Sequence, residues 1–129
     1  MTYDWKIGEK TKQWVDDESR DDVCHAEVEG QPSTSRLSRD NEWRGMGYSY
    51  IGYLYELIPE LTPILNPYLN GHGSCRAISI RKSHPRKIYN LLNKYNINIE
   101  EQDRKFVEWM LFWMVWALKH CENPVILVN

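Results

Sequence analysis

The sequence predicts an α+β fold, a small mixed sheet packed with about three helices, the last of which (residues 100–121) is central and strongly apolar. Three observations lead to this prediction. Short segments near both ends of the chain alternate polar and apolar residues, with the period of two that is typical of strands. Segments in the second half instead space their apolar residues by three and four positions, as amphipathic helices do. The last of these helical segments is apolar on nearly every face.

In the first third, residues 2–7 alternate, and Gly8 with the next residue is expected to turn the chain back into a second strand over residues 11–15. Residues 23–29 alternate again and are also predicted to form a strand. The stretch that follows, residues 30–47, is polar and rich in loop-forming residues, and no strand is predicted in it.

In the second part of the chain, helices are predicted over residues 48–61, 85–95 and 100–121. Strands are predicted over residues 75–80 and 125–128. Pairing of these two strands would enclose two helices between neighbours in one sheet.

The final helix carries large apolar side chains on more than one face: Phe106, Trp109, Met110, Trp113, Val115, Trp116 and Ala117. A half-exposed helix would leave several of these side chains in water, at a cost of about 1.5–3 kcal/mol each. We therefore expect this helix to run through the middle of the fold, covered by the other two helices and the sheet. The alternative is that one of its faces is a seam for a second copy or another partner.

Length and composition predict a single domain over residues 1–129, with a polar, acidic N-terminal third (1–47) and a helical, aromatic-rich core (48–129). The first residues do not resemble an export signal, and no apolar run reaches the roughly twenty residues of a membrane helix. The three cysteines are an odd number and are expected to be free thiols. Together these features predict a cytoplasmic location.

A run of five carboxylates is the first candidate binding site: Asp16, Asp17, Glu18, Asp21 and Asp22. Acidic clusters speed association with basic surfaces by electrostatic steering. Trp14 and Trp43 lie in the same polar third and are predicted to be contact residues beside the acids, because tryptophans anchor many interfaces. The alternatives are that the run is only a solvated turn and that the tryptophans pack in the core.

A basic strand-to-helix turn is the second candidate, formed by Arg76, Arg81, Lys82, Ser83, Arg86 and Lys87. Free backbone N–H groups at the start of a helix attract anions, and flanking cations strengthen that attraction. This turn would suit a phosphate group or a nucleic-acid backbone. The simpler interpretation is a solvated basic helix start.

Metal and catalytic sites find little support in the sequence. His72 and Cys75 have a short spacing that zinc sites use, and His120 or Cys121 could join them, but no pair of cysteines has the C-x-x-C spacing. A Cys–His nucleophile or a histidine for phosphodiester chemistry has no supporting third group. We therefore expect no metal, no cofactor and no enzymatic activity.

The function expected from these features is that of a small protein-binding module. In character the composition resembles small bacterial or phage accessory proteins that neutralise another macromolecule, among them immunity proteins against nuclease toxins. The expected partner is a protein with a basic surface, such as a toxin. The alternative function is nucleic-acid or phosphate-ligand binding through the basic turn.

Overall fold

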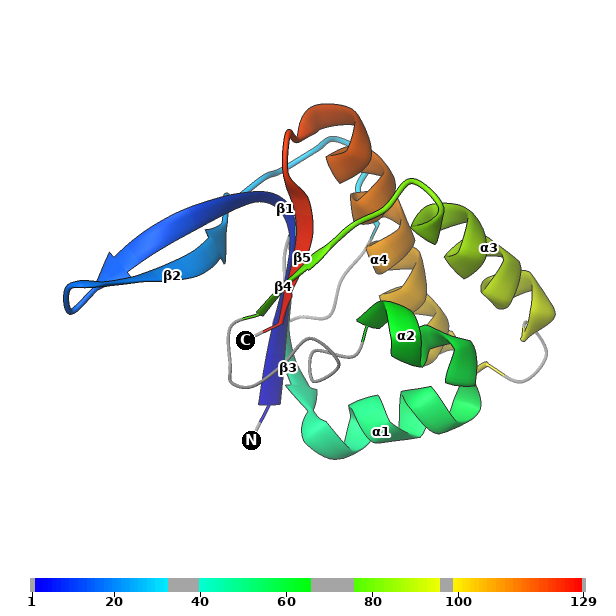
Figure 1. Ribbon diagram of the computed structural model, residues 1–129. Coiled ribbons are helices and arrows are strands. Elements are labelled where there is room, and N and C mark those ends of the chain that lie inside the picture. The colour runs from blue at the N-terminus through cyan, green and yellow to red at the C-terminus, as the bar shows by residue number, and fades with distance from the viewer. Residues whose placement is uncertain (1, 33–39, 66–75, 96–98, 129) are drawn as a thin grey trace.

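The computed structural model describes residues 2–32, 40–65, 76–95 and 99–128 and has the predicted α+β architecture (Figure 1). Helices cover one face of an antiparallel sheet, and a long β-hairpin projects away from them. The elements are, in chain order, β1 (Thr2–Val15), β2 (Glu18–Val23), β3 (Glu42–Gly47), α1 (Tyr48–Leu57), the short 3₁₀ helix η1 (Pro59–Leu61), α2 (Thr62–Leu65), β4 (Arg76–Ser79), α3 (His84–Lys94), α4 (Glu101–His120) and β5 (Pro124–Val128).

The sheet has the strand order β2-β1-β5-β4, and β3 also pairs with β1. The predicted neighbours β4 and β5 do pair, but they run antiparallel, as do the other strand pairs among the described residues. The described strands thus form an antiparallel sheet within the predicted α+β fold. Figure 1 shows why β5 runs antiparallel to β4. Helices α3 and α4 run in opposite directions, so the chain comes back to the side of the sheet where β4 ends, and β5 starts from there.

Strand β1 is continuous, and the turn predicted at Gly8 does not exist. Gly8 is instead a place of close approach: a Cβ there would lie 3.1 Å from Val23 Cγ1 and 3.3 Å from Asn41 Nδ2. The chain reverses later, at Asp16 and Asp17, which both adopt the left-handed conformation (φ 50° and 64°). Two left-handed residues between paired strands make a type I′ turn, whose twist matches the hairpin.

Two further predictions in the first third are wrong. The predicted strand over residues 23–29 is not a strand, because pairing of β2 with β1 ends at Val23. Strand β3 forms within the stretch in which no strand was predicted, because it pairs with the first residues of β1. The chain thus leaves the sheet after Val23 and rejoins it at Glu42, an excursion of which the structure describes residues 24–32, 40 and 41.

Asn41 closes the neck of this excursion. It is buried, and its side-chain amide donates hydrogen bonds to the carbonyls of Ile7 (3.0 Å) and Cys24 (2.8 Å), while its oxygen accepts one from the Ala26 N–H (3.0 Å). The side chain therefore connects its own segment to β1 and to residues 24–26, beside the backbone hydrogen bonds that Ile7 N–H donates to the Asn41 carbonyl and Cys24 N–H donates to the Glu9 carbonyl. A buried side chain with its polar atoms satisfied in this way fixes local geometry.

Helix α4 is central, as predicted. It packs against β1, β5 and α3, and the Tyr50 hydroxyl of α1 donates a hydrogen bond to the carboxylate of Asp103 at its start. Its fully buried side chains include Phe106, Trp109 and Trp113, which share one core cluster with Trp5 of β1. The other two predicted helices also form, the first of them as α1 followed by η1.

One face of α4 is less covered than the prediction required. Leu111, Phe112, Val115 and Trp116 are half-buried. The alternative expectation, that one face of this helix is a seam, thus keeps a structural basis. No helix in the described part of the chain has the length and apolarity needed to cross a membrane.

Candidate functional site

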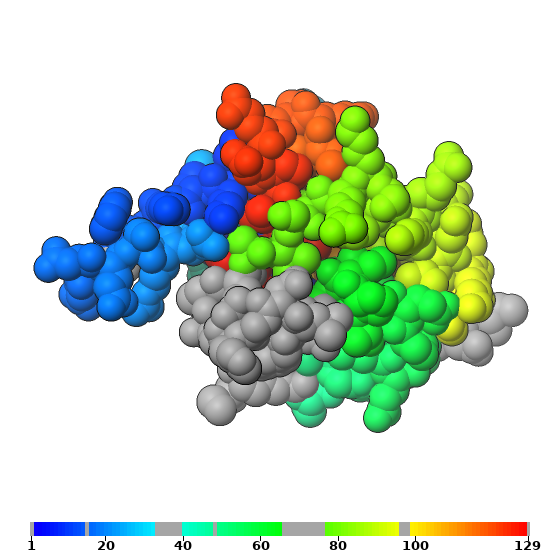
Figure 2. All heavy atoms as spheres, viewed as in Figure 1, coloured from blue at the N-terminus to red at the C-terminus, as the bar shows by residue number. Residues whose placement is uncertain are grey.

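The most prominent surface feature is the outer part of the β1–β2 hairpin, residues 10–23, which we call the arm. It extends from the sheet on the side away from the helices (Figure 1), and in Figure 2 it stands clear of the body of the molecule. Six residue pairs hold its strands in register, from Lys10 opposite Val23 to Val15 opposite Glu18. The arm is therefore a regular two-stranded ribbon with an exposed tip.

The tip combines a large aromatic ring with negative charge. Trp14 is 72% exposed, the most exposed large apolar side chain among the described residues. Asp16, Asp17 and Glu18 are exposed beside it, at the turn and at the first residue of β2. A tryptophan this exposed adds little apolar burial to the fold, so its ring is available for contact with another molecule.

The other two predicted acids behave differently. Asp21 lies 3.6 Å from the Lys10 ammonium, and Asp22 lies 3.3 Å from that of Lys6, both across the hairpin on β1. Asp22 also accepts a hydrogen bond from the Val23 N–H. These two carboxylates are half-buried and hold the base of the arm, so the predicted acidic run divides into three exposed acids at the tip and two paired acids at the base.

Trp43, predicted as a contact residue, lies in the core and is only 8% exposed. It faces Trp5 in the β1–β3 register, and its ring packs edge-on against Phe106 at 5.3 Å and tilted against Trp109 at 5.6 Å. Its polar neighbours in the sequence gave no sign of this, because the rings that bury it come from α4. Trp43 is therefore a core residue.

The predicted basic turn is brought together at the start of α3. Arg81, Lys82, Arg86 and Lys87 are all exposed there. The Ser83 side chain makes no capping hydrogen bond; instead His84 Nδ1 accepts one from the Arg81 N–H (3.1 Å). The side chain of Arg76 lies outside the described residues.

The charge around His84 explains one further property of this turn. Burial, and then the nearby cations Lys87 and Arg81, lower the pKa of His84. A neutral imidazole is consistent with its role as acceptor for the Arg81 N–H. The ring thus serves to shape the turn, while the four surrounding cations remain exposed.

An apolar groove lies along the half-buried face of α4 and was not predicted. It has a volume of about 590 Å³. One wall comes from α4, including Leu111, Phe112 and Trp116, and the other from Val28 and Pro32. The sequence could not show it, because only the tertiary fold brings residues 28–32 beside the helix. It is a further candidate contact surface beside the arm and the basic turn, and the described residues indicate no particular ligand for it.

The metal site considered from the sequence falls largely outside the described residues, which do not include His72 and Cys75. His120 and Cys121 end α4: the His120 ring stacks on Trp116 at 5.0 Å, and the free thiol of Cys121 is half-buried. Burial, and then Glu9 and Cys24, raise the pKa of Cys121, which favours the thiol over the metal-binding thiolate.

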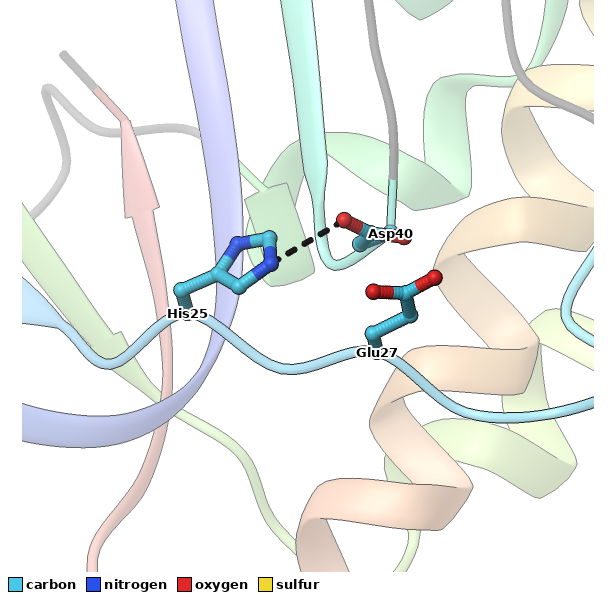
Figure 3. Close-up of side chains that lie close together, drawn as sticks. All are labelled: His25, Glu27 and Asp40. Atoms are coloured by element: carbon cyan, nitrogen blue, oxygen red, sulfur yellow. Dashed lines mark ion pairs between the residues drawn. The ribbon is translucent and has the colours of Figure 1, made fainter.

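A different group of potential ligands was missed. His25, Glu27 and Asp40 place one imidazole nitrogen and two carboxylate oxygens within 4.8 Å of one another (Figure 3). The two-residue spacing of His25 and Glu27 was visible in the sequence, but the approach of Asp40 depends on the return of the chain at Asn41.

Comparison of the chain with protein-family models, with curated proteins and with solved structures finds no match in any of the three.

Proposed function

We propose that this chain is a protein-binding module that engages a basic protein surface through the tip of its arm. The observation that carries the proposal is the exposure of Trp14 at the end of a projecting ribbon. Tryptophan is enriched among the residues that contribute most to interface affinity, and it makes this contribution when a pocket of the partner removes its ring from water. A fold with a well-formed core has no structural need to present this ring to water.

The charge at the tip indicates the chemistry of the partner. Asp16, Asp17 and Glu18 are consecutive and exposed, so the end of the arm is negative. Such a tip would be attracted to a positively charged surface, and the attraction would raise the association rate more than the final affinity. The proposed partner therefore carries Lys and Arg side chains around an apolar pocket that accepts Trp14.

At a finer level, we propose an inhibitor of the immunity type, acting in the cytoplasm on a basic protein such as a nuclease toxin. Support comes from the small size, the acidic arm and the lack of a recognisable catalytic arrangement among the described residues. An acidic projection can occupy the basic surface with which a nuclease holds its substrate backbone, since that surface is built to bind phosphates.

Parallel affinity capture with matched variants tests this function. Lysate from the cells that encode the chain is passed over the immobilised wild-type protein, a Trp14→Ser variant, and a variant with Asp16→Asn and Asp17→Gly. Asn-Gly is the preferred sequence for a type I′ turn, so the last variant removes two charges while it keeps the hairpin. A variant with Arg86→Gln and Lys87→Gln controls for the basic turn.

We expect a protein that the wild type and the basic-turn variant retain and that both arm variants lose. If every retained protein binds the arm variants equally well, the arm is not the binding site and the proposal is wrong. If retention is instead lost with the basic-turn variant and depends on nuclease-sensitive material, the alternative function in nucleic-acid binding replaces it.

A further inference from the structure

The cluster of His25, Glu27 and Asp40 lies at the base of the arm and at the neck of the 24–41 excursion. His25 and Glu27 follow directly after β2, whereas Asp40 directly precedes the neck residue Asn41. The cluster therefore joins the two ends of a segment that leaves the sheet. No function proposed above uses these three residues.

The local backbone explains why His25 and Glu27 share one side of their segment. Ala26 and Val28 are half-buried and pack against the core cluster. In an extended chain, alternate side chains point to opposite sides, so His25 and Glu27 face away from this core contact and are exposed.

Asp40 is held in place more firmly than its two neighbours. Its backbone is left-handed (φ 59°), and its carbonyl accepts a 2.8 Å hydrogen bond from Trp109 Nε1. The side chain is only 9% exposed, and its Oδ1 accepts a 2.7 Å hydrogen bond from Gln31 Nε2. Oδ2 is thereby turned toward His25, whose Nε2 lies 3.1 Å away (Figure 3).

We propose that His25, Glu27 and Asp40 form a binding site for a divalent transition-metal ion, with Zn²⁺ preferred. Neighbouring ligand atoms in a tetrahedral zinc site are about 3.3 Å apart, since each lies about 2.0–2.2 Å from the metal. The His25–Asp40 separation already meets this spacing. The third ligand atom is within 4.8 Å and belongs to an exposed glutamate that can close the remaining gap by rotation.

Charge supports a cation at this position. Two carboxylates converge here beside one imidazole. A divalent ion would offset both negative charges. The imidazole nitrogen favours Zn²⁺ over Mg²⁺ or Ca²⁺, which prefer oxygen ligands alone. The exposed side of the cluster leaves room for water as a fourth ligand, and Gln31 takes the part of the residue that orients a ligating carboxylate.

Because its ligands come from both ends of the excursion, the bound metal is expected to link these two ends beside Asn41. Metal binding to the folded chain alone stabilises that state by mass action. The site would thus stabilise the base of the arm.

The test is a Zn²⁺ titration of the chelator-treated full chain, followed by calorimetry and, with Co²⁺ as the probe, by visible absorption. We expect one ion per chain. His25→Gln and Asp40→Asn should weaken binding by at least about 100-fold, and Gln31→Ala by about 10–100-fold, the range typical of residues that orient a ligand. Cys24→Ser with Cys121→Ser serves as the control and should leave the affinity unchanged.

His25 is exposed, so its replacement tests the site even if the Asp40 variant fails to fold. Addition of Zn²⁺ should raise the unfolding midpoint of the wild type and leave that of His25→Gln unchanged. The proposal is overturned if the chain takes up no Zn²⁺, or if uptake survives His25→Gln and disappears in the cysteine control, which would place the ion on the thiols.

Discussion

Replacing Trp109 and Trp113 with phenylalanine, one at a time, separates the contribution of one hydrogen bond from that of ring burial within the same helix. The two tryptophans are one turn apart on α4, and both are fully buried. Trp109 Nε1 donates a 2.8 Å hydrogen bond to the Asp40 carbonyl, whereas Trp113 Nε1 is buried with no partner in the described part of the chain.

Both substitutions remove the same atoms, so the loss of packing is similar in the two variants. Trp109→Phe also strands the buried carbonyl of Asp40, which costs about 1–3 kcal/mol. Trp113→Phe removes an N–H group that gains little from burial. We therefore expect Trp109→Phe to lower the free energy of unfolding by about 1–2 kcal/mol more than Trp113→Phe does.

Urea unfolding followed by far-UV circular dichroism measures this difference without relying on tryptophan fluorescence. The midpoints should separate while the slopes of the two transitions stay equal. If Trp113→Phe is as destabilising as Trp109→Phe, the hydrogen bond from Trp109 to the Asp40 carbonyl does not contribute to stability as the structure indicates.

Four other substitutions test the core, the arm, the neck and one surface ion pair. Trp113→Ala should cost about 3–5 kcal/mol of unfolding free energy because it leaves a cavity, whereas Trp14→Ala should change it by no more than about 0.5 kcal/mol, which denaturant unfolding will show. Asn41→Ala removes one buried and two partly buried hydrogen bonds and should cost about 2–4 kcal/mol in the same assay; a loss below about 1 kcal/mol would contradict its role at the neck. Hydrogen bonds from Tyr95 and then Lys94 lower the pKa of Glu60 to about 2. Because its pKa is lowered, this carboxylate stabilises the fold above its usual pKa and does so progressively less as the pH falls toward about 2. The small loss of stability in Glu60→Gln at pH 7 should therefore vanish in thermal scans at acid pH. A loss that persists in acid would contradict the proposed role of the Glu60 charge.

Local sequence signals predicted the helices well and the strands of the first third poorly. Helix α3 was expected over residues 85–95 and helix α4 over residues 100–121, and each begins and ends within one residue of those limits. Apolar spacing, Pro85 and the acidic first turn of α4 are local features that the helix itself uses. The strand β3 has no such signal, because its pairing partner β1 lies about forty residues earlier in the chain.

Gly8 is another residue whose structural role could not be predicted from its local sequence. A glycine between alternating segments predicts a turn, but here its missing side chain makes room for Val23 and Asn41. Only the tertiary fold distinguishes these two uses of glycine. The actual turn falls at Asp16 and Asp17, at the start of the charged run that was also interpreted as a solvated turn.

The candidate binding residues divide for a similar reason. Trp14 and Trp43 both lie in the polar first third of the sequence, yet Trp14 faces Ser19 beyond the body of the sheet and Trp43 faces Trp5 over α4. Periodicity gives the side of a strand on which a residue lies, but it does not tell whether a helix covers that position. The acidic tip was predictable from composition, whereas the pairing of Asp21 and Asp22 with lysines required the register.

The association rate of the chain with its captured protein partner tests the central claim most directly. It should be measured at low and high salt for the wild type, for the variant with Asp16→Asn and Asp17→Gly, and for Trp14→Ser. We expect the charge variant to associate about tenfold more slowly at low salt and to approach the wild type at high salt, since steering is screened there. Trp14→Ser should mainly speed dissociation and weaken affinity by about 30-fold or more, as loss of an anchor of at least about 2 kcal/mol implies. Equal association and dissociation rates for all three proteins at both salt concentrations would contradict the proposal that the arm binds the partner.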